Sequence, residues 1–280
     1  MAKFTKTLIA AGLMAAAATP AFAADYSGDI HKNDYKWFQF NIMHGENNKL
    51  PFSNNADNNY FEMEFGGRSG IFDLYGYIDV LDVFNEGKDN FHNKDNFFMK
   101  FAPRMSIDAL TGKDLSFGPV KEVYVASVTN IADQGLFETY IGLGSDVEVP
   151  FMGKMGLNLM SRYVRENYSA SNEGKWDGYM ITTNWFKPVY NFSNGSFIAY
   201  QGYLDYMFGA DELEKTDASR TSESLQWFNG LYWHSDRFAL GYGLKVYNNM
   251  AFFKDGAQNF TGATNNTSGV GHYFAATYKF

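Results

Sequence analysis

The sequence predicts an all-β protein, namely a transmembrane antiparallel β-barrel of about twelve strands as found in bacterial outer membranes. Three observations support this prediction: the length of the alternating segments, the rhythm of the connections between them, and an alternation that runs to the last residue. Strands of soluble sheets usually have about five or six residues, whereas a strand that crosses a membrane needs about 9–11. Many segments of this chain are of the longer kind.

Side chains alternate between apolar and polar along these segments, and successive side chains of a strand point to opposite faces. The clearest example is residues 71–81, where one face is apolar and the other carries acids and tyrosines. The apolar face holds Phe72, Leu74, Ile78 and Val80, and the polar face holds Asp73, Tyr75, Tyr77 and Asp79. A barrel would turn the apolar face to lipid and the polar face to the lumen. A soluble sandwich, the competing architecture, would bury the apolar face.

The connections between segments alternate in length. We expect strands to begin near Tyr35, Tyr60, Ile71, Phe97, Pro119, Phe137, Lys154, Trp176, Phe197, Ser224, Phe238 and Gly269. Long polar connections are expected at residues 45–59, 82–96, 167–175, 209–223 and 249–268, with shorter ones between them. Residues 107–118 are a long connection within the short series, and residues 129–135 are a short connection within the long series. Outer-membrane barrels have long extracellular loops and short periplasmic turns, so both chain ends are expected in the periplasm.

The N-terminus has the features of a cleavable signal peptide over residues 1–23. Lys3 and Lys6 precede an apolar run at residues 8–18, and Ala21-Phe22-Ala23 fits the cleavage pattern. The run is too short for a transmembrane helix, which needs about 20 apolar residues. We therefore expect residues 24–280 to form the barrel domain, with residues 24–34 as a periplasmic N-terminal segment. Whether this segment plugs the periplasmic mouth is open.

The C-terminus ends within an alternating segment, in which every second residue is mostly apolar. Its apolar positions are Val270, Phe274, Ala276, Tyr278 and Phe280. A last strand that ends in phenylalanine is the general pattern of substrates of the outer-membrane assembly machinery. Phe280 is thus the expected contact with that machinery, and outer-membrane lipid is the expected surrounding.

Composition argues against several other classes of protein. The net charge of -8 disfavours a nucleic-acid binder, which normally carries a basic patch. The absence of cysteine excludes disulfides and thiolate metal sites. His234 and Ser235 are adjacent but form no catalytic dyad by themselves, because such a site is defined by geometry. His92 with Asp89 and Asp95 is better explained as a solvated acidic loop than as a metal site. We expect no catalytic residue, metal or cofactor.

Several stretches resemble the Tsx-like, nucleoside-specific channel-forming outer-membrane proteins, and within them the OmpK type. They are Asp73-Leu-Tyr-Gly-Tyr-Ile-Asp79, Phe101-Ala-Pro-Arg-Met-Ser-Ile-Asp108, Lys113-Asp-Leu-Ser-Phe-Gly-Pro-Val-Lys-Glu122, Trp176-Asp-Gly-Tyr179, His31-Lys-Asn-Asp-Tyr-Lys-Trp37, Trp233-His-Ser-Asp-Arg-Phe238 and Tyr278-Lys-Phe280. The resemblance covers essentially the whole mature chain. It implies a monomeric barrel with a narrow channel for passive nucleoside uptake. Some members also serve as bacteriophage or colicin receptors through their surface loops, and that role is the alternative function.

The expected solute contacts are polar and aromatic side chains on the inner face. They are Glu62, Glu64, Asp73, Tyr75, Tyr77, Asp79, Lys100, Arg104, Glu122, Tyr124, Arg162, Tyr203 and Asp205. Bases stack on aromatic rings, ribose hydroxyls need polar partners, and carboxylates would repel nucleotides. The competing interpretation is structural: opposite charges on neighbouring strands stabilise any barrel, and tyrosines fill a lumen or form an interface girdle. Pro103 leaves the inward orientation of Arg104 open, and the register of residues 176–186 is ambiguous.

Overall fold

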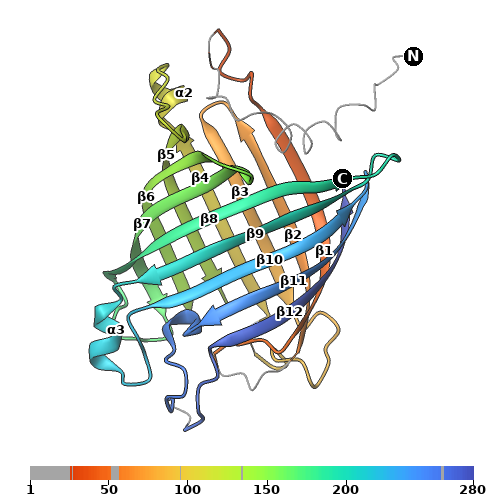
Figure 1. The fold of residues 1–280 in the computed structure, drawn as a ribbon. Coiled ribbons are helices and arrows are strands. Elements are labelled where there is room, and N and C mark those ends of the chain that lie inside the picture. The colour runs from red at the N-terminus through yellow and green to blue at the C-terminus, as the bar shows by residue number, and fades with distance from the viewer. Residues whose placement is uncertain (1–25, 27, 52–56, 95, 134, 260–261) are drawn as a thin grey trace.

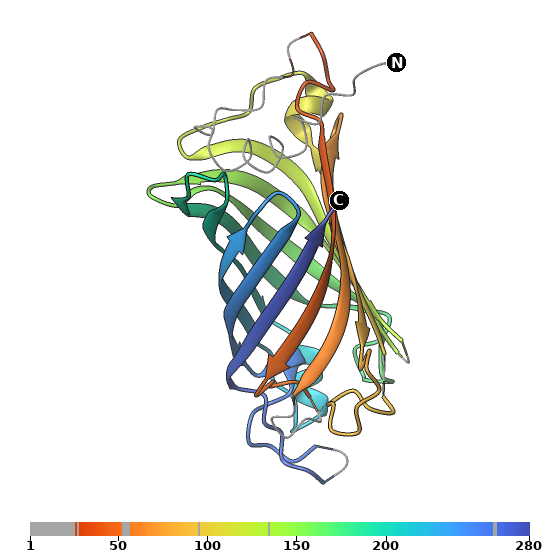
Figure 2. The same cartoon turned by 90° about the vertical axis from the view of Figure 1, so that its right-hand side faces the viewer.

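The protein is a closed β-barrel. The computed structural model describes residues 26, 28–51, 57–94, 96–133, 135–259 and 262–280. Within these residues, each strand pairs antiparallel with its neighbours in the chain, and the first pairs with the last, so that the sheet closes on itself (Figures 1 and 2). The predicted fold class is confirmed. The signal peptide predicted for residues 1–23 lies outside the described residues and stays a prediction.

The twelve strands begin within two residues of the predicted positions. They are β1 (Tyr35–Glu46), β2 (Asn58–Ser69), β3 (Phe72–Leu81), β4 (Phe97–Ser106), β5 (Val120–Ala132), β6 (Leu136–Val149), β7 (Gly153–Asn167), β8 (Lys175–Asn191), β9 (Phe197–Phe208), β10 (Ser224–His234), β11 (Phe238–Asn248) and β12 (Gly269–Lys279). The short helices α2 (Ile107–Thr111), α3 (Asp211–Thr216) and η1 (Met250–Phe252) lie in the connections. None of the described helices is long and apolar enough to cross a membrane.

The two ends of the barrel differ as the loop rhythm predicts. Helix α2 and the C-terminus lie at one end, together with the short turns, and we call this the periplasmic end (Figure 1). Helix α3, η1 and the long connections lie at the opposite, extracellular end. Both exceptions in the predicted series are observed: β4 ends at Ser106 and β5 begins only at Val120 at the periplasmic end, whereas β5 ends at Ala132 and β6 already begins at Leu136 at the extracellular end.

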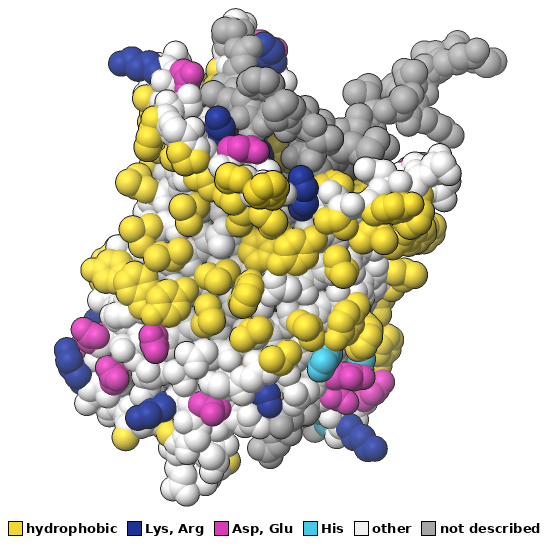
Figure 3. All heavy atoms as spheres, viewed as in Figure 1, with side chains coloured by type: hydrophobic (Ala, Val, Ile, Leu, Met, Phe, Trp, Pro, Cys, Tyr) yellow, Lys and Arg dark blue, Asp and Glu magenta, His cyan; other side chains and the backbone are white. Residues whose placement is uncertain are grey.

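The outer wall carries an apolar band, visible in Figure 3 between more polar ends. The large aliphatic side chains that it exposes include Leu143, Leu159, Leu231 and Leu240, each more than half exposed. A continuous apolar surface of this extent is typical of contact with membrane or partner. Aromatic pairs lie near its borders, with Tyr278 against Phe280 at the periplasmic side and Tyr163 against Trp176 at the extracellular side. This arrangement matches the aromatic girdles of outer-membrane barrels.

Two local ambiguities of the sequence are resolved by strand pairing. Pro103 pairs with Leu74 and leaves the register of β4 against β5 unchanged, so that Arg104 keeps its inward orientation. In β8, Met180 and Thr182 are buried on the inner face, whereas Tyr179 is exposed on the outer face. The ambiguity arose because this part of the inner face is apolar.

Candidate functional site in the barrel lumen

Polar side chains on the inner faces of the strands form two groups in the lumen, and a third group lies under the extracellular loops. The periplasmic charge cluster consists of Arg68, Asp73, Arg104, Glu122, Tyr124, Asp146 and Lys154. The central site consists of Asn41, Glu62, Glu64, Tyr75, Tyr77, Asp79, Lys100, Tyr203, Asp205 and Lys245. The extracellular cap contains Glu138 and Arg162. Every residue expected from the sequence to face the lumen falls into one of these groups.

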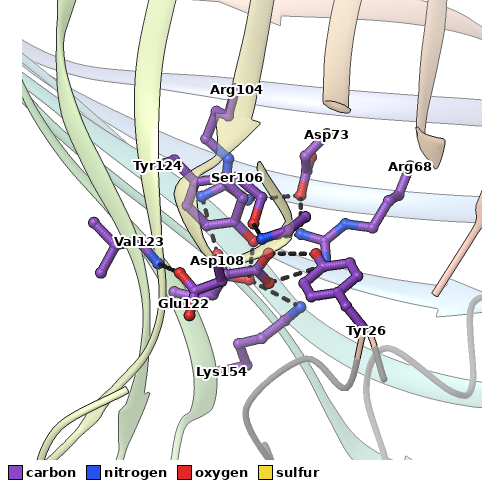
Figure 4. Close-up of polar contacts among 12 residues, drawn as sticks. Tyr26, Arg68, Asp73, Arg104, Ser106, Asp108, Glu122, Val123, Tyr124 and Lys154 are labelled. Atoms are coloured by element: carbon purple, nitrogen blue, oxygen red, sulfur yellow. Dashed lines mark hydrogen bonds and ion pairs between the residues drawn. The ribbon is translucent and has the colours of Figure 1, made fainter. Parts of the chain in front are cut away.

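The periplasmic charge cluster is a chain of alternating charges (Figure 4). Arg68 makes ion pairs with Asp73 at 3.1 Å and with Glu122 at 3.0 Å. Arg104 joins Asp73 and Asp146, each at 2.9 Å. Because opposite charges on neighbouring strands stabilise a sheet, these contacts favour the structural interpretation for Asp73, Arg104 and Glu122.

Two further side chains complete this cluster. Lys154 pairs with the second oxygen of Asp146 at 3.2 Å. The hydroxyl of Tyr124 donates to Asp146 at 3.1 Å, and the Arg104 guanidinium lies 4.0 Å from the centre of the Tyr124 ring. Three cations (Arg68, Arg104, Lys154) therefore face three carboxylates (Asp73, Glu122, Asp146). This balance makes the cluster neutral as a whole.

The N-terminal segment contacts the periplasmic charge cluster. The Tyr26 hydroxyl donates to Glu122 at 2.5 Å and accepts from Arg68 at 3.1 Å. Burial and the hydrogen bond to Glu122 raise the pKa of Tyr26 to about 12, so the hydroxyl stays protonated at neutral pH. Eight residues later, the Asp34 carboxylate accepts a hydrogen bond from the Gly70 amide at 2.8 Å, in the turn between β2 and β3. The segment is thus fastened at two points beside the periplasmic mouth.

The acidic wall of the central site comes from β2 and β3. Glu62 and Asp79 are direct partners in the strand register, and like charges in that position repel each other. Asn41 donates through Nδ2 to Glu62 at 2.5 Å and to Glu64 at 3.3 Å. Tyr75 donates to Glu64 at 2.9 Å. One oxygen of Asp79 and the Oδ1 of Asn41 are buried and have no hydrogen-bond partner among the described residues.

An ion pair crosses the lumen at the central site. Lys100 on β4 lies 2.9 Å from Asp205 on β9, although β5 to β8 separate these strands along the wall. Asp205 also accepts a hydrogen bond from Thr182 at 2.5 Å. Such a contact between distant strands requires both side chains to extend into the lumen. A solute must therefore pass beside this pair or displace it.

Aromatic rings line the same level. Trp37, Tyr75 and Tyr77 form a row in which successive ring centres are 6.3 and 6.2 Å apart. Tyr203 stacks on Phe228 at 5.9 Å, with 23° between the rings. A Cβ atom on Gly66 would lie 2.6 Å from the Trp37 ring, so glycine is what allows the indole to lie against the wall. The central site therefore combines ring faces with hydrogen-bond acceptors.

The extracellular cap also contains an apolar cluster, which was not predicted from the sequence. Met160, Met180 and Met207 on the inner wall pack with Leu213 of α3 and Phe252 of η1, all nearly fully buried. Arg162 borders this cluster, with its guanidinium 4.5 Å from the centre of the Phe252 ring and 2.7 Å from Glu138. Two extracellular loops thus fold inward over β5 to β9. The available signal was the two-residue spacing that places Met160 on the same face as Arg162 and Met207 on the same face as Asp205.

Other polar residues of the lumen were also missed. Arg68 lies on the same face of β2 as Glu62 and Glu64, and the same alternation could have identified it. Lys245 on β11 was not predicted to contact the solute, yet its ammonium lies 5.7 Å from the Tyr203 ring centre and 5.9 Å from that of Tyr273. Asn41 on β1 lies opposite Glu62 and was likewise not predicted.

The histidines considered from the sequence form no catalytic arrangement with the neighbouring serine. His234 contacts Gln201 at 3.1 Å, whereas the Ser235 hydroxyl donates to the Phe238 carbonyl at 3.2 Å. His92 pairs with Asp82 at 2.9 Å. Within the described ranges, no three His, Asp or Glu side chains are grouped so that they could hold a metal ion.

Comparisons with known proteins match nearly the whole chain. A family model described as "Nucleoside-specific channel-forming protein, Tsx" matches residues 32–280. The outer membrane protein OmpK of Vibrio parahaemolyticus is 54% identical over 278 residues, covering 98% of this chain and 99% of the relative. The nucleoside-specific channel-forming protein Tsx of Salmonella typhimurium is 32% identical over 294 residues, covering 96% and 99%. Among solved structures, the NanC porin is 8% identical with a TM-score of 0.48, covering 86% of this chain and 100% of that chain.

Proposed function

Because the chain belongs to the family of nucleoside-specific channel-forming proteins, Tsx, we propose that its lumen carries nucleosides and similar small solutes by passive diffusion. The protein lies in the outer membrane. Diffusion down a gradient needs no cofactor and no catalytic group. The proposal therefore depends on whether the lumen can recognise such a solute.

The observation that carries the proposal is the central site, where ring faces and unsatisfied acceptors lie at one level. A nucleobase can stack on the row formed by Trp37, Tyr75 and Tyr77. A ribose brings hydroxyl donors, and the free oxygens of Asn41 and Asp79 lack donors. A buried acceptor without a partner costs free energy, so a solute that supplies hydroxyl groups is favoured there.

The charges of the site favour a neutral solute. Glu62, Glu64 and Asp79 make no ion pair with any residue that the structure describes. A phosphate ester that reached this wall would face these carboxyl groups at short range, and repulsion between like charges is stronger where little water separates them. The nucleoside rather than the nucleotide is therefore the proposed solute of the central site.

The double substitution of Tyr75 and Tyr77 by alanine should weaken nucleoside blockade of the channel. Stacking of a base on an aromatic side chain contributes ~1–3 kcal/mol, so the blocking concentration should rise by roughly tenfold or more. The measurement is single-channel conductance of the refolded mature protein in a planar bilayer, titrated with adenosine. The matched control replaces both tyrosines by phenylalanine, which keeps the rings and removes the hydroxyl bound to Glu64. Unchanged blockade in the alanine variant, with the barrel still resistant to SDS, would remove these rings from the solute path.

A second function, surface reception of a bacteriophage or colicin, is favoured by the connection between β11 and β12. Its tip is held by its own hydrogen bonds, among them Asn259 to the Ala263 carbonyl and Asn265 to the Ala257 carbonyl, at 2.9 and 2.8 Å. The connection extends beyond the barrel at the extracellular end (Figures 1 and 2). A protruding connection whose described residues are held by hydrogen bonds is a suitable attachment point, because those residues lose little conformational entropy on binding.

Replacement of residues 256–265 by two glycines should abolish attachment by such a phage and leave adenosine blockade unchanged. The readout is phage adsorption to cells that carry the variant, with surface amounts matched by immunoblot. The connection between β9 and β10 is less suited to this test, because Leu213 is 1% exposed and belongs to the cap. Normal adsorption to the shortened loop would exclude this tip as the receptor site.

A further inference from the structure

Arg220 is a buried cation that has no counterion among the residues the structure describes. It lies in the connection between β9 and β10 and is only 7% exposed. Its Nε atom is enclosed and has no hydrogen-bond partner, and no carboxylate of the described residues makes an ion pair with it. Its guanidinium lies 3.7 Å from the centre of the Phe253 ring. Buried charges are normally paired, because transfer of an unpaired charge from water is costly.

The other arginines inside the barrel behave differently. Arg68, Arg104 and Arg162 each make at least one ion pair of 3.1 Å or less with a carboxylate. Arg220 is thus the exception among the inward-lying arginines of the described chain. A contact with an aromatic face stabilises a cation, but it leaves the hydrogen-bonding edge of the guanidinium unused.

A carboxylate and a second cation both lie close enough to Arg220 to affect its pKa. The Asp217 carboxylate attracts it, but that carboxylate accepts hydrogen bonds from the amide and hydroxyl of Ser219, at 2.8 and 2.7 Å. Burial lowers the pKa of Arg220 to about 10, the attraction of Asp217 opposes this shift, and the repulsion of Arg162 adds to it. Arg220 therefore remains charged at neutral pH beside a second cation.

The position of Arg220 is held rigidly at the extracellular mouth. The Thr221 amide donates to the Phe252 carbonyl at 3.0 Å and the Lys254 amide donates to the Ser219 carbonyl at 2.8 Å, so the two extracellular loops are joined on both sides of it. Phe252, the neighbour of the ring that Arg220 covers, packs into the methionine cluster of the inner wall. Arg220 therefore lies where the cap meets the entrance of the lumen.

We propose that Arg220 is the anchor of an oxyanion-binding subsite at the extracellular mouth, which takes a phosphate or carboxylate group. A guanidinium presents a planar fork of donors that matches both groups, and charge-assisted bonds of this kind are strong. The subsite goes beyond the nucleoside channel, because the acidic wall of the central site would oppose the onward passage of an anion. A bound anion would therefore occupy the mouth and reduce the current.

Isothermal titration calorimetry of the detergent-folded mature chain tests this subsite, with sodium phosphate and sodium acetate titrated separately at constant ionic strength. Binding of phosphate alone would identify a phosphate site, and binding of acetate alone a carboxylate site. The substitution Arg220→Gln should weaken the binding by about tenfold or more, because a charge-assisted bond is lost. Arg237→Gln is the matched control, because Arg237 lies in the turn before β11 at the periplasmic end and contacts Tyr278.

Two further results make the test decisive. Arg220→Lys keeps the charge but loses the planar fork of donors, so its affinity for the anion should be intermediate. This variant replaces Arg220→Gln in the test if Arg220→Gln does not fold. The proposal would be overturned if the native protein bound neither phosphate nor acetate. It would also be overturned if the native protein and Arg220→Gln bound the anion equally well. Adenosine blockade is recorded on the same preparations. Adenosine blockade depends on the central site, whereas anion binding depends on Arg220. Failure of the proposed nucleoside channel can therefore be distinguished from failure of the anion subsite.

Discussion

Lys100→Ala should increase the single-channel conductance of the barrel several times over. The Lys100 ammonium and the Asp205 carboxylate meet at 2.9 Å from strands that are not neighbours, so the pair bridges the lumen. Removal of the side chain breaks this bridge and widens the path at the central site. Asp205 retains the hydrogen bond from Thr182, which keeps the remaining carboxylate against its own wall.

The same substitution should make the pore more selective for cations. The central site loses a positive charge while Glu62, Glu64 and Asp79 remain, and fixed charges in a narrow lumen attract ions of the opposite sign. The measurement is the open-channel conductance, together with the reversal potential in a potassium chloride gradient. Lys36→Ala is the control, because Lys36 is an exposed lysine near the periplasmic end of β1. A conductance equal to that of the native protein would place the ion pair beside the conducting path rather than across it.

Arg104→Gln should have the largest effect on stability among single substitutions in the lumen. It leaves Asp73 without one of its two cations and Asp146 with Lys154 alone. Breaking a buried ion pair costs about 3–5 kcal/mol, against about 0–1 kcal/mol for an exposed pair. The side chain of Asp146 is 5% exposed and that of Asp73 is 12% exposed. We therefore expect a loss nearer the buried range.

The measurement for Arg104→Gln is urea unfolding of the protein folded into phospholipid vesicles, followed by tryptophan fluorescence. Arg165→Gln is the matched control, because the Arg165 side chain is 60% exposed and its contact with Glu166 is 3.5 Å long. The control should unfold at the same urea concentration as the native protein. If Arg104→Gln also does so, water in the lumen screens the periplasmic charge cluster, and its charges have another role.

Much of the fold could be predicted from the residue order. The period of two along a strand decides which side chains face lipid and which face the lumen, and Tyr75, Tyr77 and Lys100 were placed inward on that basis alone. The lengths of the connections distinguished the two ends of the barrel. The inward position of Arg104 was open only because Pro103 precedes it, and the continuous register of β4 against β5 resolved that point.

The candidate site was less predictable, because its important contacts join residues that are far apart in the chain. The central residues were named from the sequence, but the partners of Lys100 and Lys245 were not. The cap was missed because a methionine on an inner face was not distinguished from one that faces lipid. Met160, Met180 and Met207 face inward beneath Leu213 and Phe252, which come from two different loops.

The sequence by itself determined the secondary structure, the inward and outward faces, which end carries the long connections, and the family of this protein. Each of these follows from patterns that repeat within a few residues or along one segment. Only the tertiary structure decided which charges meet. Lys100 and Asp205 are 105 residues apart and come together because the sheet closes with one particular register. Arg220 has no counterion within the described part of the chain, because two loops fold over the mouth and bury it, and no local pattern encodes that packing.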